Sequence, residues 1–232
     1  MLRMNGRRAR QRRRAAADPG PSGIVSPSRE EVFAAIKTLS PDLNWSELRD
    51  GLRPVFIRRR PLPPGMSAPL IRRLPPGLDV ALGVDIGPAF LYVGSQLLES
   101  WPVSEGEAFD IALANLRAVV EEERYFEMAY EPIEDIPVWW YQSRGGLASG
   151  LLLLEDIVVE RYGDQPRVLM APMRNLLLAA PYDADREVMA WLRDEVSNAD
   201  PNGIDLPIFA LVDGRLTVDS AAPLRRRAAL IH

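Results

Sequence analysis

The chain has no cysteine and only one histidine among its 232 residues, and these two shortages exclude much of enzyme chemistry. Without Cys there is no disulfide, no zinc or iron–sulfur site built on thiolates, and no thiol nucleophile. The histidine is His232, the last residue, a position rarely rigid enough for Ser-His-Asp catalysis or metal ligation. We therefore expect no metal site and no cofactor. The remaining enzyme classes use carboxylates, carboxylate-bound Mg²⁺, or Ser, Thr, Tyr and Lys nucleophiles, and Lys37 is the only lysine.

Long apolar runs are also absent. The leucine-rich stretch 151–159 is interrupted by Glu155 and Asp156, whereas a membrane helix needs about 20 apolar residues. The basic residues 1–23 are not followed by an apolar segment, so they do not form a secretory signal. These patterns predict a cytoplasmic protein with no membrane association.

Residues 1–23 differ in charge from the rest of the chain. Seven Arg and one Asp give this segment a formal charge of about +6, and since the whole chain is −4, the remainder is about −10. The composition predicts a disordered Arg-rich tail. One hypothesis is that residues 1–18 associate with nucleic acid or an anionic surface. The alternatives are a solvated tail and a translated upstream region that is foreign to the native protein.

Helix signals are clear at two capping boxes. Ser28 with Glu31 predicts a helix that starts near residue 28 and ends at Pro41, with Val32, Phe33, Ile36 and Leu39 at helical spacing. Ser104 with Glu107 opens a helix over about 104–123 that carries an apolar stripe. Shorter helices are expected at 95–101, at about 149–161, and from an Asp183 cap to about Ser197.

Strands are expected mainly in adjacent pairs between these helices. One pair lies in 80–94 around a Gly87–Pro88 turn, another in 167–181, and a third in 206–219 around Asp213–Gly214, a strong signal for a type I′ turn. Single strands are expected at 54–60 and 136–142. Adjacent pairing favours an α+β fold, a mostly antiparallel sheet with helices packed on it, over strict β-α-β alternation.

Domain organisation follows from these elements. Residues 24–220 are expected to form a single domain, and residues 221–232 a loose C-terminal tail. The proline-rich segment 61–79 predicts an extended loop on the core, with a polyproline ligand for a partner domain as the alternative. The stretch EPIEDIP, 131–137, is expected to be a solvated loop rather than a catalytic carboxylate cluster.

The glycine turn after the aromatic strand is a candidate anion site. Gly145–Gly146 leads into a helix whose N-terminal N–H groups can donate hydrogen bonds to an anion, with Arg144 and Ser149 nearby. The phosphate-loop lysine is missing, because Leu151 follows Gly150. The alternative is structural: a tight turn, with Ser149 as the N-cap.

Three other polar residues are candidates for ligand binding. Asn115 lies beside the apolar stripe of its helix, where its amide either ties down a neighbouring loop or contacts a ligand. Arg174 and Asn175 lie between two apolar strands, and Arg174 either binds a carboxylate or phosphate or pairs with Asp183 or Asp185. No catalytic residue is assigned. Trp139, Trp140 and Tyr141 should alternate between the two faces of their strand.

Four stretches resemble the YtpQ-like family of bacterial proteins of unknown function. They are SQLLESWPVSEGEAFDIALANLRAV, GGLASGLLLL, RVLMAPMRNLLLAAP and PIFALVDGRL, and the resemblance covers about residues 80–216. Ala112, Asn115 and Leu116 match the Ala-x-x-Asn-Leu helix of that family. The resemblance implies a fold and no particular chemistry.

Together these features favour a non-catalytic domain that binds a protein partner. Two alternatives stay open. One is a carboxylate-dependent hydrolase or a phosphate-ligand binder that uses the Gly145–Ser149 turn with Arg144 and Arg174. The other is nucleic-acid association through residues 1–18.

Overall fold

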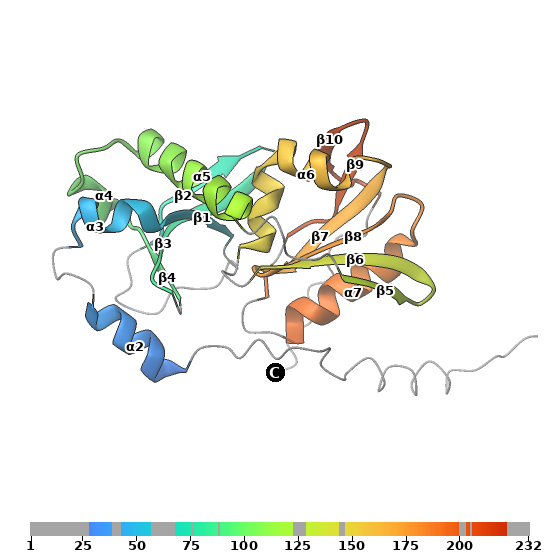
Figure 1. The fold of residues 1–232 in the computed structure, drawn as a ribbon, viewed down its shortest axis with the longest axis horizontal. Helices are drawn as coiled ribbons and strands as arrows, with labels where there is room; N and C mark the ends of the chain where they lie inside the picture. The colour runs from blue at the N-terminus through green and yellow to red at the C-terminus, as the bar shows by residue number, and fades with distance from the viewer. Residues whose placement is uncertain are drawn as a thin grey trace, which may run out of the picture.

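The computed structural model shows an α+β fold built on two antiparallel sheets, which confirms the expected class (Figure 1). The structure describes residues 28–38, 43–56, 68–75, 77–87, 89–122, 129–143, 147–199, 203–204 and 206–221. The Arg-rich segment 1–23 lies outside this range, and so does nearly all of the expected C-terminal tail. None of the helices described is long and apolar enough to cross a membrane.

The first sheet is organised around its central strand, β3 (Leu78–Asp85). β1 (Leu52–Phe56) pairs with one side of β3, and β2 (Ile71–Leu74) and β4 (Phe90–Tyr92) follow one another along the other side. The long helix α5 (Glu105–Glu122) packs against β1. The short elements of this half are α3 (Trp45–Leu48), η1 (Arg49–Gly51) and α4 (Ser95–Glu99).

The expectation of an extended loop over 61–79 is wrong for its second half, because β2 and the start of β3 lie there. The residues of β2 contain no proline, so none of them lacks the backbone N–H that strand pairing uses. Arg73 adds a bidentate contact to Asp79 on β3, with Nε–Oδ1 at 2.8 Å and Nη2–Oδ2 at 3.0 Å. Residues 61–67 lie outside the described part.

The second sheet has the order β10-β9-β7-β8-β6-β5, and every neighbouring pair is antiparallel. Its strands are β5 (Ala129–Ile133), β6 (Ile136–Gln142), β7 (Arg167–Met173), β8 (Leu176–Pro181), β9 (Phe209–Val212) and β10 (Arg215–Val218).

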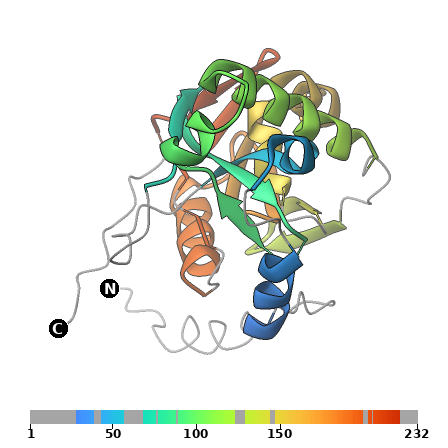
Figure 2. The same ribbon diagram turned by 90° about the vertical axis from the view of Figure 1, so that its left-hand side faces the viewer.

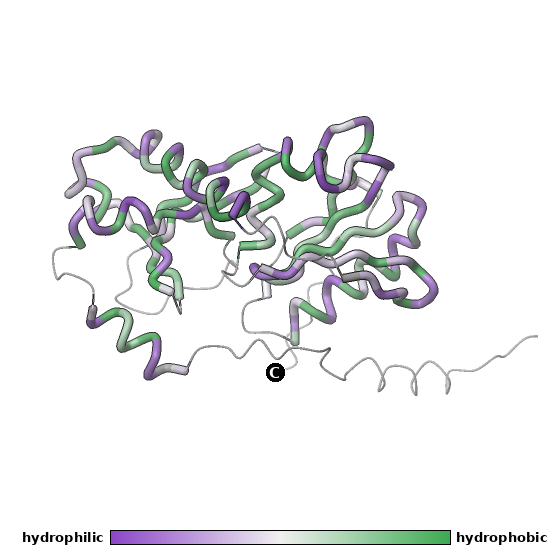
Figure 3. The backbone as a smooth tube through the Cα atoms, in the orientation of Figure 1, coloured by the Kyte–Doolittle hydropathy of each residue, from purple (hydrophilic) through white to green (hydrophobic). Residues whose placement is uncertain are grey.

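Helices cover both faces of the second sheet. Helix α7 (Arg186–Ala199) packs on one face, while the 3-10 helix η2 (Ala148–Leu153) and α6 (Glu155–Tyr162) lie on the other (Figure 1). The aromatic strand alternates as expected: Trp140 packs in the core on the α7 side, and Trp139 and Tyr141 pack in the core on the η2 side. Figure 3 shows the apolar residues concentrated along the strands and the polar ones toward the outer turns.

Two helix starts differ from expectation. Asp185 and not Asp183 caps α7, because its Oδ1 accepts from the backbone N–H of Glu187 at 2.8 Å. The expected helix 149–161 is divided into η2 and α6 at Leu154, whose ψ of 70° is not helical. Ser149 therefore lies inside η2 and is not an N-cap.

Both capping boxes are confirmed. At the start of α2 (Arg29–Thr38), the Ser28 N–H donates to Glu31 Oε2 at 2.7 Å, and the Glu31 N–H donates to Ser28 Oγ at 3.2 Å. Ser104 and Glu107 make the same reciprocal bonds at α5, at 2.8 and 3.3 Å.

The 3-10 helix η2 joins the two halves of the molecule. It contacts β1 and α5 of the first half and β7 and β8 of the second. Its approach to α5 depends on a glycine, because a Cβ on Gly150 would lie 3.0 and 3.1 Å from the two Cδ atoms of Leu116, which is fully buried. One core of buried apolar residues consequently runs through both sheets.

Gly150→Ala should therefore destabilise the protein by about 1–2 kcal/mol, since the added methyl group overpacks a closed core. Gly106→Ala is the matched control. Position 106 lies in α5 with no neighbour nearer than Ser104 Oγ at 3.9 Å, so this change should stabilise by about 0.5–1 kcal/mol. Urea unfolding of the two variants tests the contact, and equal or greater stability of Gly150→Ala than of the parent would contradict it.

The sequence did not predict the hairpin turn between β5 and β6. Residues 131–137 do not form a solvated loop, because β5 and β6 meet there through a two-residue turn at Glu134 and Asp135. Both residues have positive φ, 51° and 66°. The predicted type I′ turn at Asp213–Gly214 is confirmed, with φ of 51° and 70°.

The turn at Glu134 and Asp135 is strained, and a glycine in it would relieve this strain. A non-glycine residue in the left-handed region costs about 1 kcal/mol, and asparagine and glycine are favoured there. Glu134→Asn with Asp135→Gly should raise the unfolding free energy by about 1 kcal/mol, measured by chemical denaturation. The reverse change at the other hairpin, Gly214→Ala, should lower it by a similar amount, and a gain there would refute the argument.

Candidate functional site

Three of the residues proposed from the sequence meet at one corner of the second sheet. The backbone N–H of Ser149 donates to the carbonyl oxygen of Arg174 at 2.9 Å, and the N–H of Ser143 donates to the carbonyl oxygen of Asn175 at 3.0 Å. Ser143 and Ser149, which precede and follow residues 144–146, are therefore both hydrogen-bonded to the β7–β8 turn. We call Ser143, Ser149, Arg174 and Asn175 the hairpin corner. Arg144 belongs to the stretch 144–146, which the structure does not describe.

Two backbone N–H groups of η2 near the hairpin corner are not available to an anion. The Ser149 N–H is bonded to Arg174, and the Gly150 N–H donates to the carbonyl oxygen of Leu147 at 2.8 Å. Ser149 is only 3% exposed, so its hydroxyl is withdrawn from solvent. The helix N-terminal site envisaged from the sequence requires free N–H groups, and these two are already used within the protein.

Arg174 contributes a contact between the two sheets. Its Nη2 donates to the hydroxyl of Tyr92, on β4 of the first sheet, at 3.1 Å. The expected ion pair with Asp183 or Asp185 does not form. Strand β8 separates the β7–β8 turn from those carboxylates, and six residues of extended strand span about 20 Å.

Asn115 lies apart from the hairpin corner and faces η1. Its Nδ2 donates to the carbonyl oxygens of Arg49 at 2.7 Å and Leu52 at 3.2 Å. The prediction that the Asn115 amide ties down a neighbouring loop is therefore confirmed. They fix the start of β1 against α5.

A cluster of arginine and aromatic side chains was missed by the sequence reasoning. The guanidinium of Arg167 lies 4.2 Å from the ring centre of Trp139, and that of Arg161 lies 5.1 Å from the ring centre of Tyr141. Alternation along β6 places both rings on one face, but nothing in the sequence indicates which arginines cover them. Burial raises the pKa of the nearby Tyr162 hydroxyl far above its usual value, although Arg161 partly opposes this. Tyr162 consequently stays protonated and cannot act as a base at neutral pH.

Carboxylates do not gather into a metal site in the described ranges. No group of three or more His, Cys, Asp or Glu side chains there has the arrangement to hold a metal ion. Several carboxylates have structural partners. Asp219 accepts from Arg186 Nε at 2.5 Å in a largely buried pair, and Asp156 makes a bidentate contact to Arg117 at 2.6 and 2.9 Å. The hydrogen bond from Arg117 lowers the pKa of Asp156.

An apolar pocket of about 120 Å³ opens where the two halves meet. Its floor and walls come from β2, α5, η2 and β10, and Glu155 of α6 stands in its lining. The carboxylate of Glu155 accepts from the Leu216 N–H at 2.8 Å, which fixes the position of this acid. We call this the leucine pocket; its lining residues are Leu74, Pro75, Leu113, Leu152, Leu153, Glu155 and Leu216. It offers apolar contacts and one carboxylate, whose Oε1 already accepts a backbone hydrogen bond.

Helix α2 carries an apolar face that belongs to neither core. Phe33 is 62% exposed and Ile36 is 43% exposed, although both follow the spacing of an amphipathic helix. Val32, beside them, is only partly buried. Figures 1 and 2 show α2 below the first sheet, on the side opposite α5.

No family model, curated protein or solved structure matches this chain.

The role of Asn115 is tested by two substitutions that remove its amide donor. Asn115→Ala removes two bonds to backbone carbonyls and should cost about 1–2 kcal/mol of stability. Asn115→Asp should cost more, because it places a carboxylate against two carbonyl oxygens. Denaturation midpoints should fall in the order parent, Ala, Asp. An Asp variant as stable as the parent would show that the amide is not needed as a donor.

Proposed function

We propose that this protein is a non-catalytic interaction domain that binds a protein partner through α2. The observation that carries the proposal is the exposed apolar face of that helix, formed by Phe33 and Ile36. Large apolar side chains are usually buried in monomeric proteins, and contiguous exposed ones mark interaction sites. Burying each of these two side chains against a partner is worth about 1.5–3 kcal/mol.

The length of α2 supports the same conclusion. The helix has ten residues, and an isolated helix shorter than about 12–15 residues is marginal in water. Its capping box favours the helical state without burying anything. Docking in an apolar groove stabilises such a helix, and side chains at i, i+3 or i+4 are the usual anchors. Positions 33 and 36 have this spacing.

The hairpin corner supports binding chemistry less well. Its backbone donors are bonded within the protein and its serine is buried. A carboxylate-dependent hydrolase needs two carboxylates that converge on a cleft, and the pocket described above contains one, Glu155. Membership of the YtpQ-like family stays a prediction, and it would supply a fold without an activity.

A photo-crosslinker placed at two positions of α2 tests the proposal. Benzoylphenylalanine at position 33 should give a discrete protein adduct in the native host. At position 34, an exposed residue turned about 100° from position 33 around the helix axis, it should give much less. Ile36→Glu should reduce the adduct from position 33 at least tenfold, since a charge then occupies an apolar anchor.

Control measurements separate loss of binding from loss of folding. Ala34→Gln should leave adduct formation unchanged, and every variant should keep the circular dichroism and melting temperature of the parent, because α2 lies outside both cores. Equal labelling from positions 33 and 34, or no adduct from either, would refute binding through α2.

A further inference from the structure

We infer that the leucine pocket binds a small amphipathic cation, a primary ammonium group carried on an apolar chain of about six carbons. The pocket is separate from the exposed face of α2, so this inference does not depend on the proposed function. Three features of the described residues point to it: the size of the pocket, the acceptor character of its polar groups, and the pairing of the neighbouring arginines.

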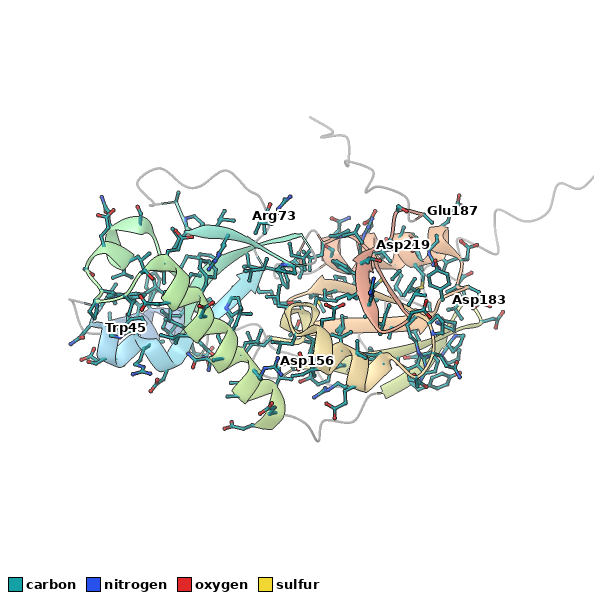
Figure 4. All side chains as sticks on the ribbon, turned by 90° about the horizontal axis from the view of Figure 1, so that it is seen from above. Trp45, Arg73, Asp156, Asp183, Glu187 and Asp219 are labelled. Carbon is teal, nitrogen blue, oxygen red and sulfur yellow. The ribbon has the colours of Figure 1, made fainter. Side chains whose placement is uncertain are left out.

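The pocket has room for one apolar group. Its volume is about 120 Å³, and five of its seven lining residues are leucines. A closed apolar cavity of about 150 Å³ holds benzene, so this volume admits a chain or ring of about six carbons. In Figure 4, Arg73, next to Leu74, and Asp156, next to Glu155, both lie where the two halves of the molecule meet. A ligand bound here would therefore contact residues of both halves.

The polar groups of the lining are hydrogen-bond acceptors. Glu155 is the only lining residue with a polar side chain, and its Oε1 accepts from the Leu216 N–H. Its second carboxylate oxygen has no hydrogen bond or ion pair to any described residue. The carbonyl oxygens of Leu152 and Leu153 likewise accept no hydrogen bond from the described backbone. A primary ammonium carries three N–H donors and no acceptor, which matches this set of oxygens.

Neighbouring arginines do not neutralise Glu155. Three arginines on the strand and helix that border the pocket have partners of their own; they are Arg72 over the Phe109 ring, Arg73 with Asp79, and Arg117 with Asp156. Arg215 adjoins Leu216, but alternation along β10 turns the two side chains to opposite faces. An anionic ligand would meet the Glu155 carboxylate and no side-chain donor, and a neutral ligand would leave this charge unpaired. A cation is therefore the ligand that the lining favours.

Three probes with the same six-carbon chain test this preference. Hexylammonium, 1-hexanol and hexanoate are each titrated into the nitrogen-15-labelled full chain, and the backbone amide shifts of the lining residues are followed by NMR. Hexylammonium should bind about fivefold more tightly than hexanol, because the Glu155 carboxylate attracts a cation. Hexanoate should bind most weakly. The difference should shrink at about 1 M salt, where exposed charges are screened.

A conservative substitution isolates the charge. Glu155→Gln keeps an oxygen that can accept from the Leu216 N–H but removes the negative charge, so hexylammonium should bind no more tightly than hexanol. Glu131→Gln is the matched control. It removes the same charge from an exposed residue of β5, at the opposite edge of the second sheet from β10, and should leave the preference unchanged.

A second substitution tests the apolar part of the site. Leu113→Gln places an amide in the lining and should weaken hexylammonium and hexanol alike by about fivefold, because less apolar surface is buried. Leu113 lies outside both cores, so the variant should keep the circular dichroism of the parent.

Four outcomes would overturn the assignment. Hexanol could bind as tightly as hexylammonium, or Glu155→Gln could keep the preference for the cation. The shifts could be confined to amides outside the lining. Finally, the amides of Leu153 and Leu216 could shift when the protein concentration alone is raised, which would assign the pocket to a second copy. Crosslinking from position 33 does not involve this pocket, so failure of either proposal leaves the other standing.

Discussion

The packing of η2 between α5 and the two sheets is the constraint on which the rest of the structure depends. This six-residue 3-10 helix contacts both halves, and Gly150 allows it to approach the buried Leu116 closely. The ion pair between Arg117 and Asp156 strengthens the same junction at the surface (Figure 4). Without this contact each sheet would expose the face that η2 covers. The larger of the two cores, which includes residues of both sheets, therefore depends on this junction.

The same constraint explains why the hairpin corner is structural. Ser143 at the end of β6 and Ser149 in η2 are both buried, so their backbone N–H groups need partners within the protein. The carbonyl oxygens of Arg174 and Asn175 supply them. The N–H groups of Ser149 and Gly150, which could otherwise face a ligand, are bonded within the protein. The Arg174–Tyr92 bond extends this fastening to the first sheet.

Helix α2 does not contribute side chains to either core. Every other described helix of eight or more residues places side chains in one of the two cores, whereas Phe33 and Ile36 remain exposed. The leucine pocket is another apolar surface that the described residues leave open. A short helix that is apolar on one side gains further stability when that side is covered.

The sequence by itself determined the elements whose signals are local. Reciprocal bonds of Ser with Glu, the Asp213–Gly214 turn and the apolar periodicity of α5 depend on residues a few positions apart, so their structures followed the pattern. The sequence indicated that four polar residues are unusual, but it could not assign their hydrogen-bond partners; they are Ser149, Arg174, Asn175 and Asn115. Those partners lie on other elements: Asn115 reaches Arg49, and Arg174 reaches Tyr92. The Glu134–Asp135 turn, the division at Leu154 and the exposure of Phe33 were likewise decided by tertiary structure alone, because strand pairing, core packing and burial depend on contacts between residues far apart in the chain.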